Sequence, residues 1–100
     1  MQIHFERSGG FTGMRLNKTF NSETLPADEA NALQGELASA NFFNLPGTIA
    51  APAGGADRFH YRISVESGAQ QHTVEVDEAA VPETLQPLLQ HLTILARTHR

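Results

Sequence analysis

The N-terminal residues alternate between apolar and polar side chains, which is the pattern of a strand with one buried face. In residues 2–7, Ile3 and Phe5 fall on one face of the strand, whereas His4 and Glu6 fall on the other. After a glycine-rich stretch, a second and less regular set of residues shares a face: Met14, Leu16, Lys18 and Phe20. The two segments predict a β-hairpin with an unusually long, glycine-rich tip.

A second hairpin is predicted further along the chain, where four apolar residues alternate with polar ones: Phe59, Tyr61, Ile63 and Val65. A two-residue turn at Ser67-Gly68 leads into a second strand over residues 70–77. This turn sets the expected register, which pairs Phe59 with Val76, Tyr61 with Val74 and Ile63 with His72. The same register places His60 opposite Glu75 on the outer face, and the apolar faces of the two strands coincide.

Two helices are predicted from apolar positions that recur at helical spacing. In the first, Pro26 suits the first helical position, Asn41 suits a left-handed cap, and the apolar stripe holds Ala30, Leu33, Leu37 and Ala40. The second follows a short turn at residues 82–85, runs from Gln86 to Arg97, and presents Leu85, Leu88, Leu89, Leu92, Leu95 and Ala96.

The order hairpin, helix, hairpin, helix predicts an α+β fold with residues 1–100 in a single domain. We expect a two-layer ββαββα sandwich, in which a four-stranded antiparallel sheet carries two helices on one face. The predicted core contains Leu33, Leu37, Phe59, Ile63, Val74, Val76, Leu88, Leu92 and Leu95. Residues 45–56 hold prolines and glycines but no charge, so Gly47–Asp57 is expected to be a long surface loop.

Composition excludes several classes of protein. A formal net charge of −4 disfavours a nucleic-acid partner, because phosphate binding needs a basic surface. No apolar run approaches the length of a membrane span, no signal peptide is visible at the N-terminus, and the chain has no cysteine. We therefore expect a cytoplasmic protein that is a monomer when free, with neither a nucleic-acid nor a membrane partner.

The sequence shows no established catalytic or metal-binding motif. The histidines are scattered, without the spacings of metal ligands, and none of the serines lies in a nucleophile motif. No cofactor or metal is expected, and His72 is interpreted as a histidine at the edge of the core with a hydrogen-bond partner. A small enzyme that uses His60 and Glu75 stays open as a weaker hypothesis.

The tip of the first hairpin is the candidate interaction site, with the sequence Ser8, Gly9, Gly10, Phe11, Thr12, Gly13 and Met14. It is not a phosphate loop, because it lacks the Lys-Ser/Thr ending and is followed by a predicted strand, not a helix. Two interpretations of Phe11 remain open. It is either an apolar anchor for a partner or a lid that folds back over the open end of the sheet.

Several blocks of the chain, in order, resemble the emfourin family: "SGGFTGM", "LPADEANAL", "NFFNLP", "DRFHYRISVESG", "QQHTVEV" and "VPETLQPLLQHL". The resemblance runs from Ile3 to Arg97. Emfourins are protein inhibitors of protealysin-like, thermolysin-type zinc metalloproteases, and the family is associated with a cytoplasmic partner protease.

The resemblance implies that this chain is an inhibitor and not an enzyme. It also implies that residues 8–14 enter the substrate cleft of such a protease, with the Gly47–Asp57 loop as a secondary contact. The alternative is a non-inhibitory protein-interaction module or subunit that uses an exposed edge of the sheet.

Overall fold

The computed structural model describes residues 1–9, 15–49 and 59–98. The first predicted hairpin is present as β1 (Gln2–Gly9) and β2 (Leu16–Asn21), and the second as β4 (Phe59–Ser67) and β5 (Gln70–Asp77). Period-two alternation is kept in β1, where Ile3 and Phe5 are buried and the residues between them are not. Each apolar face lies against the helices, so the alternation predicts the buried face correctly.

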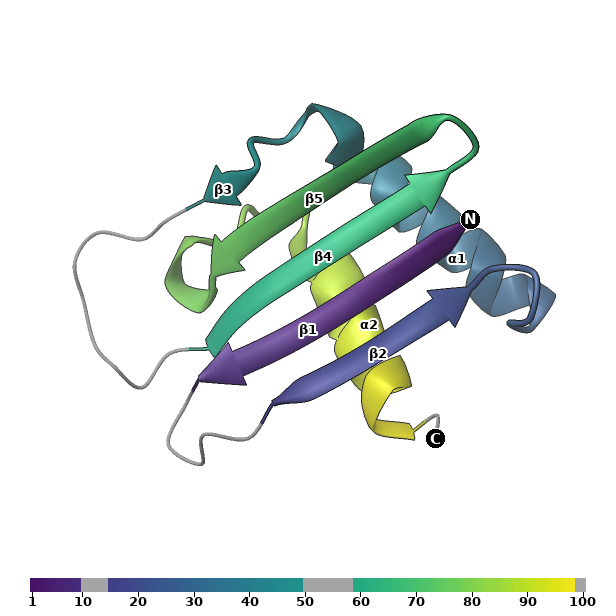
Figure 1. Cartoon of the computed structure of the whole chain (residues 1–100), viewed down its shortest axis with the longest axis horizontal. Helices are drawn as coiled ribbons and strands as arrows, with labels where there is room; N and C mark the ends of the chain where they lie inside the picture. Colours follow the sequence, from purple (N-terminus) through teal and green to yellow (C-terminus); the bar gives the residue numbers. More distant parts are fainter. Residues whose placement is uncertain (10–14, 50–58, 99–100) are drawn as a thin grey trace.

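Among the described residues the sheet has five strands, in the order β2-β1-β4-β5-β3, which corrects the expectation of four antiparallel strands (Figure 1). The additional strand, β3 (Thr48–Ile49), pairs in parallel with β5, whereas the other neighbours are antiparallel. A strand of two residues is too short to show an alternating pattern, and it lies in a segment that was expected to be entirely loop. Pairing of β1 with β4 also joins the two hairpins and places β1 inside the sheet.

The second hairpin has a different register from the one predicted. Ser67 pairs with Gln70, so the turn residues are Gly68 and Ala69, and Tyr61 lies opposite Val76. Gly68 has a φ of 59°, which a glycine adopts without the strain that a serine would have at the first turn position. The shift amounts to two residues, so each side chain keeps its predicted face.

Phe59 is only partly buried, and its prediction as a core residue is wrong. In the observed register β5 ends at Asp77, which pairs with His60, and so Phe59 has no strand partner on that side. On its other side Phe59 pairs with Gly9, which has no side chain to cover the ring. The other predicted core residues are all buried: Leu33, Leu37, Ile63, Val74, Val76, Leu88, Leu92 and Leu95.

Two helices, α1 (Ala27–Ser39) and α2 (Gln86–Thr98), lie behind the sheet in the view of Figure 1. Helix α1 begins one residue after Pro26, and Asn41, with a φ of 52°, supplies the predicted left-handed residue after it. A 3-10 turn, η1 (Phe42–Asn44), follows α1, and a second, η2 (Glu78–Ala80), follows β5. The predicted turn before α2 is closed by a hydrogen bond from the Leu85 amide to the Pro82 carbonyl oxygen, at 2.9 Å.

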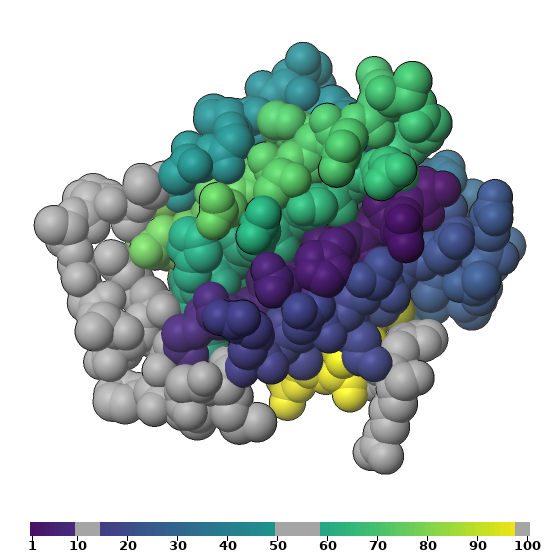
Figure 2. Space-filling view, in the orientation of Figure 1, coloured from purple at the N-terminus to yellow at the C-terminus, as the bar shows by residue number. Residues whose placement is uncertain are grey.

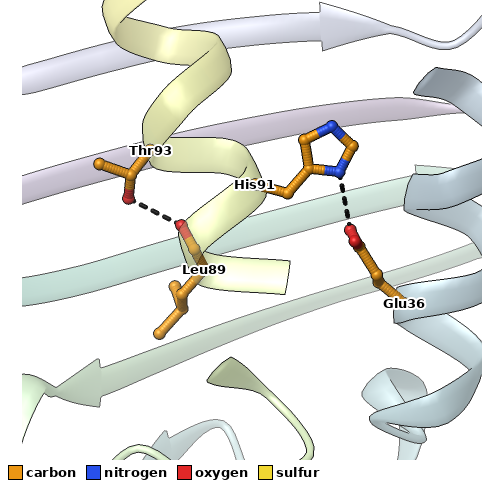
Figure 3. Close-up of polar contacts among 4 residues, drawn as sticks. All are labelled: Glu36, Leu89, His91 and Thr93. Carbon is orange, nitrogen blue, oxygen red and sulfur yellow. Dashed lines mark hydrogen bonds and ion pairs between the residues drawn. The ribbon is translucent and has the colours of Figure 1, made fainter. Parts of the chain in front are cut away.

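One apolar cluster joins the sheet to both helices, and it includes every residue of the two predicted helical stripes apart from Ala30, which is also buried. A polar contact connects the helices themselves, because His91 Nδ1 lies 2.9 Å from Glu36 Oε1 (Figure 3). A hydrogen bond of this kind contributes about 0.5–1.5 kcal/mol net. His72 is part-buried beside the core, with Nε2 at 2.7 Å from the Leu45 carbonyl oxygen, as its interpretation from the sequence requires.

Candidate functional site

The described residues that flank the two predicted contact segments all lie at the same end of the strands of the sheet (Figure 1). Gly9 at the end of β1 pairs with Phe59 at the start of β4, while Ile49 at the end of β3 pairs with Val76 near the end of β5. We call this end of the sheet the loop end and define it by five residues: Gly9, Leu16, Ile49, Phe59 and Asp77. The chain therefore leaves the sheet for residues 10–14 and for residues 50–58 at one end of the molecule.

The predicted site residues lie only partly within the described structure. Ser8 and Gly9 are the last two residues of β1, and Gly9 has a φ of 92°, a conformation that strains any other residue. In the second segment, Thr48–Ile49 form β3, and the Glu75 amide donates a hydrogen bond to the Gly47 carbonyl oxygen at 2.8 Å. The expectation that Gly47–Asp57 is loop throughout is thus wrong at its start. Gly10–Met14 and residues 50–57 lie outside the described residues.

An aromatic and charged cluster lies at the loop end on the face that carries the helices. The Arg7 guanidinium carbon is 4.4 Å from the centroid of the Phe59 ring, a cation–π arrangement. The Phe59 amide donates a hydrogen bond of 2.9 Å to Glu78 Oε1. Tyr61 stacks on Phe5 with ring centroids 6.1 Å apart. These contacts join β1, β4 and η2 immediately beside the points where the two segments leave the sheet.

Tyr61 is the titratable group in this cluster with a clear shift. Its phenol pKa is raised above the ordinary value of 10.0 by burial and by the negative charge of Glu78. Arg7 lowers the phenol pKa, through its positive charge and a side-chain hydrogen bond to the phenol. The phenol therefore remains neutral at physiological pH and keeps its hydroxyl group as a hydrogen-bond donor.

Figure 2 views the opposite face of the sheet directly, and the hollows on that face are lined mainly by polar side chains. Near the loop end this face has a hollow of about 260 Å³ lined by Glu6, Ser8, Arg15, His60, Arg62 and Glu75. The observed register pairs His60 with Asp77 and Arg62 with Glu75, so the predicted direct pairing of His60 with Glu75 is wrong. His60 and Glu75 are diagonal neighbours instead.

The contact between His60 and Glu75 gives little support to a catalytic pair. His60 Nε2 lies 3.4 Å from Glu75 Oε1, and the two side chains are 48% and 44% exposed. A long contact between exposed groups is typical of a weak surface ion pair. In the part of the chain that the structure describes, no group of three or more His, Cys, Asp or Glu residues is arranged to hold a metal. No described helix has the length and apolar character needed to cross a membrane.

Sequence reasoning missed Arg7, Tyr61 and Glu78 as members of the site. One signal was available, because the alternation that buries Ile3 and Phe5 also places Arg7 on the apolar face. A charged residue at such a position requires a partner, which here is the Phe59 ring. The role of Glu78 had no signal in the sequence, since its bond to Phe59 depends on how β5 leads into η2.

In a comparison with known families, the family model described as Emfourin matches residues 5–93. The matched region begins within β1 and ends within α2, and it contains all the predicted contact residues. Comparisons with curated proteins and with solved structures give no match.

Proposed function

This chain belongs to the emfourin family, and on that premise we propose that it inhibits a thermolysin-type, protealysin-like zinc metalloprotease by blocking the substrate cleft. Membership of an inhibitor family supports a metalloprotease inhibitor in general and argues against an enzyme. The protease class and the mode of binding are the content of the proposal. So is a cytoplasmic partner, which fractionation of cells that make both proteins would test.

The arrangement of the loop end is the observation that carries the proposal. Both segments predicted to contact the protease are attached to the sheet there, although they are far apart in the sequence. An inhibitor of a cleft enzyme needs a projecting surface that is built from few segments and presented from one side. The shared attachment supports residues 8–14 as the main contact and residues 47–57 as the secondary one.

The base of the proposed contact is held firmly by the described residues. β1 pairs with β2 as far as Arg7 and with β4 as far as Gly9 at the loop end. Arg7, Phe59 and Glu78 then add side-chain contacts between β1, β4 and η2. Binding that does not have to order its own scaffold loses less conformational entropy, so a rigid base favours tight inhibition.

Phe11 is the proposed anchor of the interaction. Thermolysin-type proteases prefer a large apolar side chain immediately after the cleaved bond, and Phe11 is the aromatic residue of the segment. Buried aromatic residues commonly dominate the energy of protein interfaces. Gly10 and Gly13 allow the backbone to approach the walls of the cleft closely.

Truncation of the anchor tests the proposal. Phe11→Ala is expected to weaken inhibition by roughly 30- to 1000-fold, equivalent to about 2–4 kcal/mol, with little change in melting temperature. Phe43→Ala is the matched control, because Phe43 is a partly buried aromatic beside Met1, at the other end of β1. Residual activity of a thermolysin-type protease is measured with each variant.

Three outcomes separate the interpretations of Phe11. Lost inhibition with an unchanged melting temperature supports the anchor, whereas lost inhibition with a lowered melting temperature supports the lid. Full inhibition by both Phe11→Ala and Gly10→Val would refute the proposed role of the segment.

The alternative of a partner strand at a sheet edge is less well supported. The edge strands are β2 and β3, and β3 has only two residues. In β2, Lys18 pairs with Phe5 and so shares the helix-bearing face of the sheet. An inward-facing lysine on an edge strand is a known means of discouraging the addition of another strand.

A further inference from the structure

The hollow on the outer face of the sheet lies beside the proposed contact surface for the protease. Ser8, which lines the hollow, is the first residue of the proposed contact segment 8–14, and Arg15 follows that segment directly. His60 and Arg62 come from β4, where the chain returns from the second segment. A protease bound at the loop end would therefore extend over or beside this hollow.

The charged groups of the hollow divide into those with partners and those without. Glu6 Oε1 accepts a hydrogen bond from Asn17 Nδ2 at 3.2 Å, and Glu75 Oε1 lies 3.4 Å from His60 Nε2. Among the described residues, by contrast, neither Arg15 nor Arg62 makes an ion pair or a side-chain hydrogen bond. Among the described residues each carboxylate thus has one contact, through Oε1, whereas neither guanidinium group has one, although Arg62 lies directly across from Glu6 and Glu75 in the sheet.

Two free guanidinium groups around a hydroxyl form a surface suited to a carboxylate. Arginine presents N–H donors in a planar fork that matches the two oxygens of a carboxylate, and the Ser8 hydroxyl adds a further donor. The hollow holds two arginines and two glutamates, a formal charge of zero in a chain with a formal net charge of −4. Because Glu6 and Glu75 offset the two cations, recognition would depend on hydrogen-bond geometry as well as on charge.

From these observations we infer that Arg15 and Arg62 form a recognition site for an acidic side chain, an Asp or Glu on the rim of the protease cleft. This inference rests on the proposed function, and it adds a polar contact beside the apolar anchor. Charged contacts at the rim of an interface mainly accelerate association and weaken with salt, whereas the apolar anchor mainly slows dissociation. The two contacts are therefore separable by kinetics.

The first experiment tests carboxylate binding without a protease. The peptide acetyl-Asp-Asp-amide is titrated into the protein, with acetyl-Asn-Asn-amide as the neutral control, and backbone amide shifts are followed by NMR. We expect shifts at Ser8, Arg15 and Arg62 with the acidic peptide alone. The double variant Arg15→Gln/Arg62→Gln should lose these shifts, and Arg97→Gln should keep them. Shifts that are absent, or that survive in the double variant, overturn the inference.

The second experiment measures inhibition of a thermolysin-type protease at low and high salt. The double variant is expected to raise the inhibition constant by roughly 5- to 50-fold at low salt, with most of the change in the association rate. A pair of single substitutions provides the matched comparison, because Arg62→Gln and Arg97→Gln remove the same charge but only the first lies in the hollow. Equal effects of these two substitutions would assign the change to net charge and overturn the inference.

The two experiments distinguish failure of the inference from failure of the proposed function. Peptide shifts without any change in inhibition would show a carboxylate site that the protease does not use, which overturns the inference but leaves the inhibitor proposal intact. If the wild-type protein does not inhibit, the proposed function fails, and with it the assignment of the carboxylate to a protease.

Discussion

Substitution of Leu92 by alanine tests how far the packing of α2 on the sheet stabilises the whole fold. Leu92 is 0% exposed and belongs to the cluster that joins both helices to the sheet. The change removes about three carbon groups, and loss of their burial costs roughly 2–2.5 kcal/mol at about 0.8 kcal/mol for each. A sealed site that cannot collapse adds a cavity term, so the expected total is about 3–4.5 kcal/mol, inside the range measured for buried leucines.

Ile94 supplies the control on the same helix. It is 60% exposed, so Ile94→Ala removes a similar volume from a side chain that is mostly in water. Alanine has the higher helix propensity in both substitutions, and the gain is larger for Ile94→Ala because β-branched isoleucine ranks below leucine, but each gain stays below about 0.7 kcal/mol. We expect Ile94→Ala to change the free energy of unfolding by less than about 1 kcal/mol.

Urea denaturation followed by circular dichroism measures both variants. For a domain of this size, each kcal/mol corresponds to roughly 4–8 °C in melting temperature, so Leu92→Ala should lower it by about 12–36 °C. A Leu92→Ala melt that matches the wild type would refute the sealed core around α2. Equal losses of unfolding free energy in both variants would show that the stability of the isolated helix, and not its packing on the sheet, determines the cost of these substitutions.

Two further predictions concern the loop end. Because Tyr61 is the only tyrosine in the chain, ultraviolet titration of tyrosinate reports its pKa directly, and we expect a midpoint above the ordinary value of 10.0. The raised pKa means that the unfolded state releases its proton first, so the stability due to this group is complete below about pH 10 and is lost as the pH rises through the folded pKa. Glu78→Gln should lower the midpoint, and an unchanged midpoint would contradict the assigned electrostatic cause. Replacement of residues 50–57 by a Gly/Ser segment that retains Gly47 and β3 should weaken inhibition without lowering the melting temperature, because β3 stays paired with β5; undiminished inhibition would remove the second segment from the proposed contact.

Features that depend on neighbours in the sequence were predictable. The stripes of both helices, the left-handed residue Asn41 and the turn before α2 all follow from spacing, from backbone preference or from proline. The buried faces of the strands follow from alternation, which survived even where the register did not. The candidate segment at residues 8–14 was also visible, because three glycines around an aromatic residue are unusual in so short a stretch.

Features that depend on distant parts of the chain required the tertiary structure. The register of the second hairpin differs by two residues from the prediction, because alternation is equally satisfied by either pairing and only the turn at Gly68 decides between them. β3 exists because Gly47 and Ile49 lie beside β5, and two residues contain no periodic signal. The pairing of β1 with β4 is also non-local, and it makes Phe59 a neighbour of Gly9 and Arg7.

The sequence by itself determined which residues are apolar on each element, and hence two layers, two hairpins, two helices and a glycine-rich segment to consider for binding. Only the tertiary structure decided that the described residues next to both contact segments lie at the same end of the sheet. It also placed Arg15 and Arg62 around one hollow. The physical reason is that propensity and periodicity act over a few residues, whereas strand order is chosen by the burial of whole faces against one another.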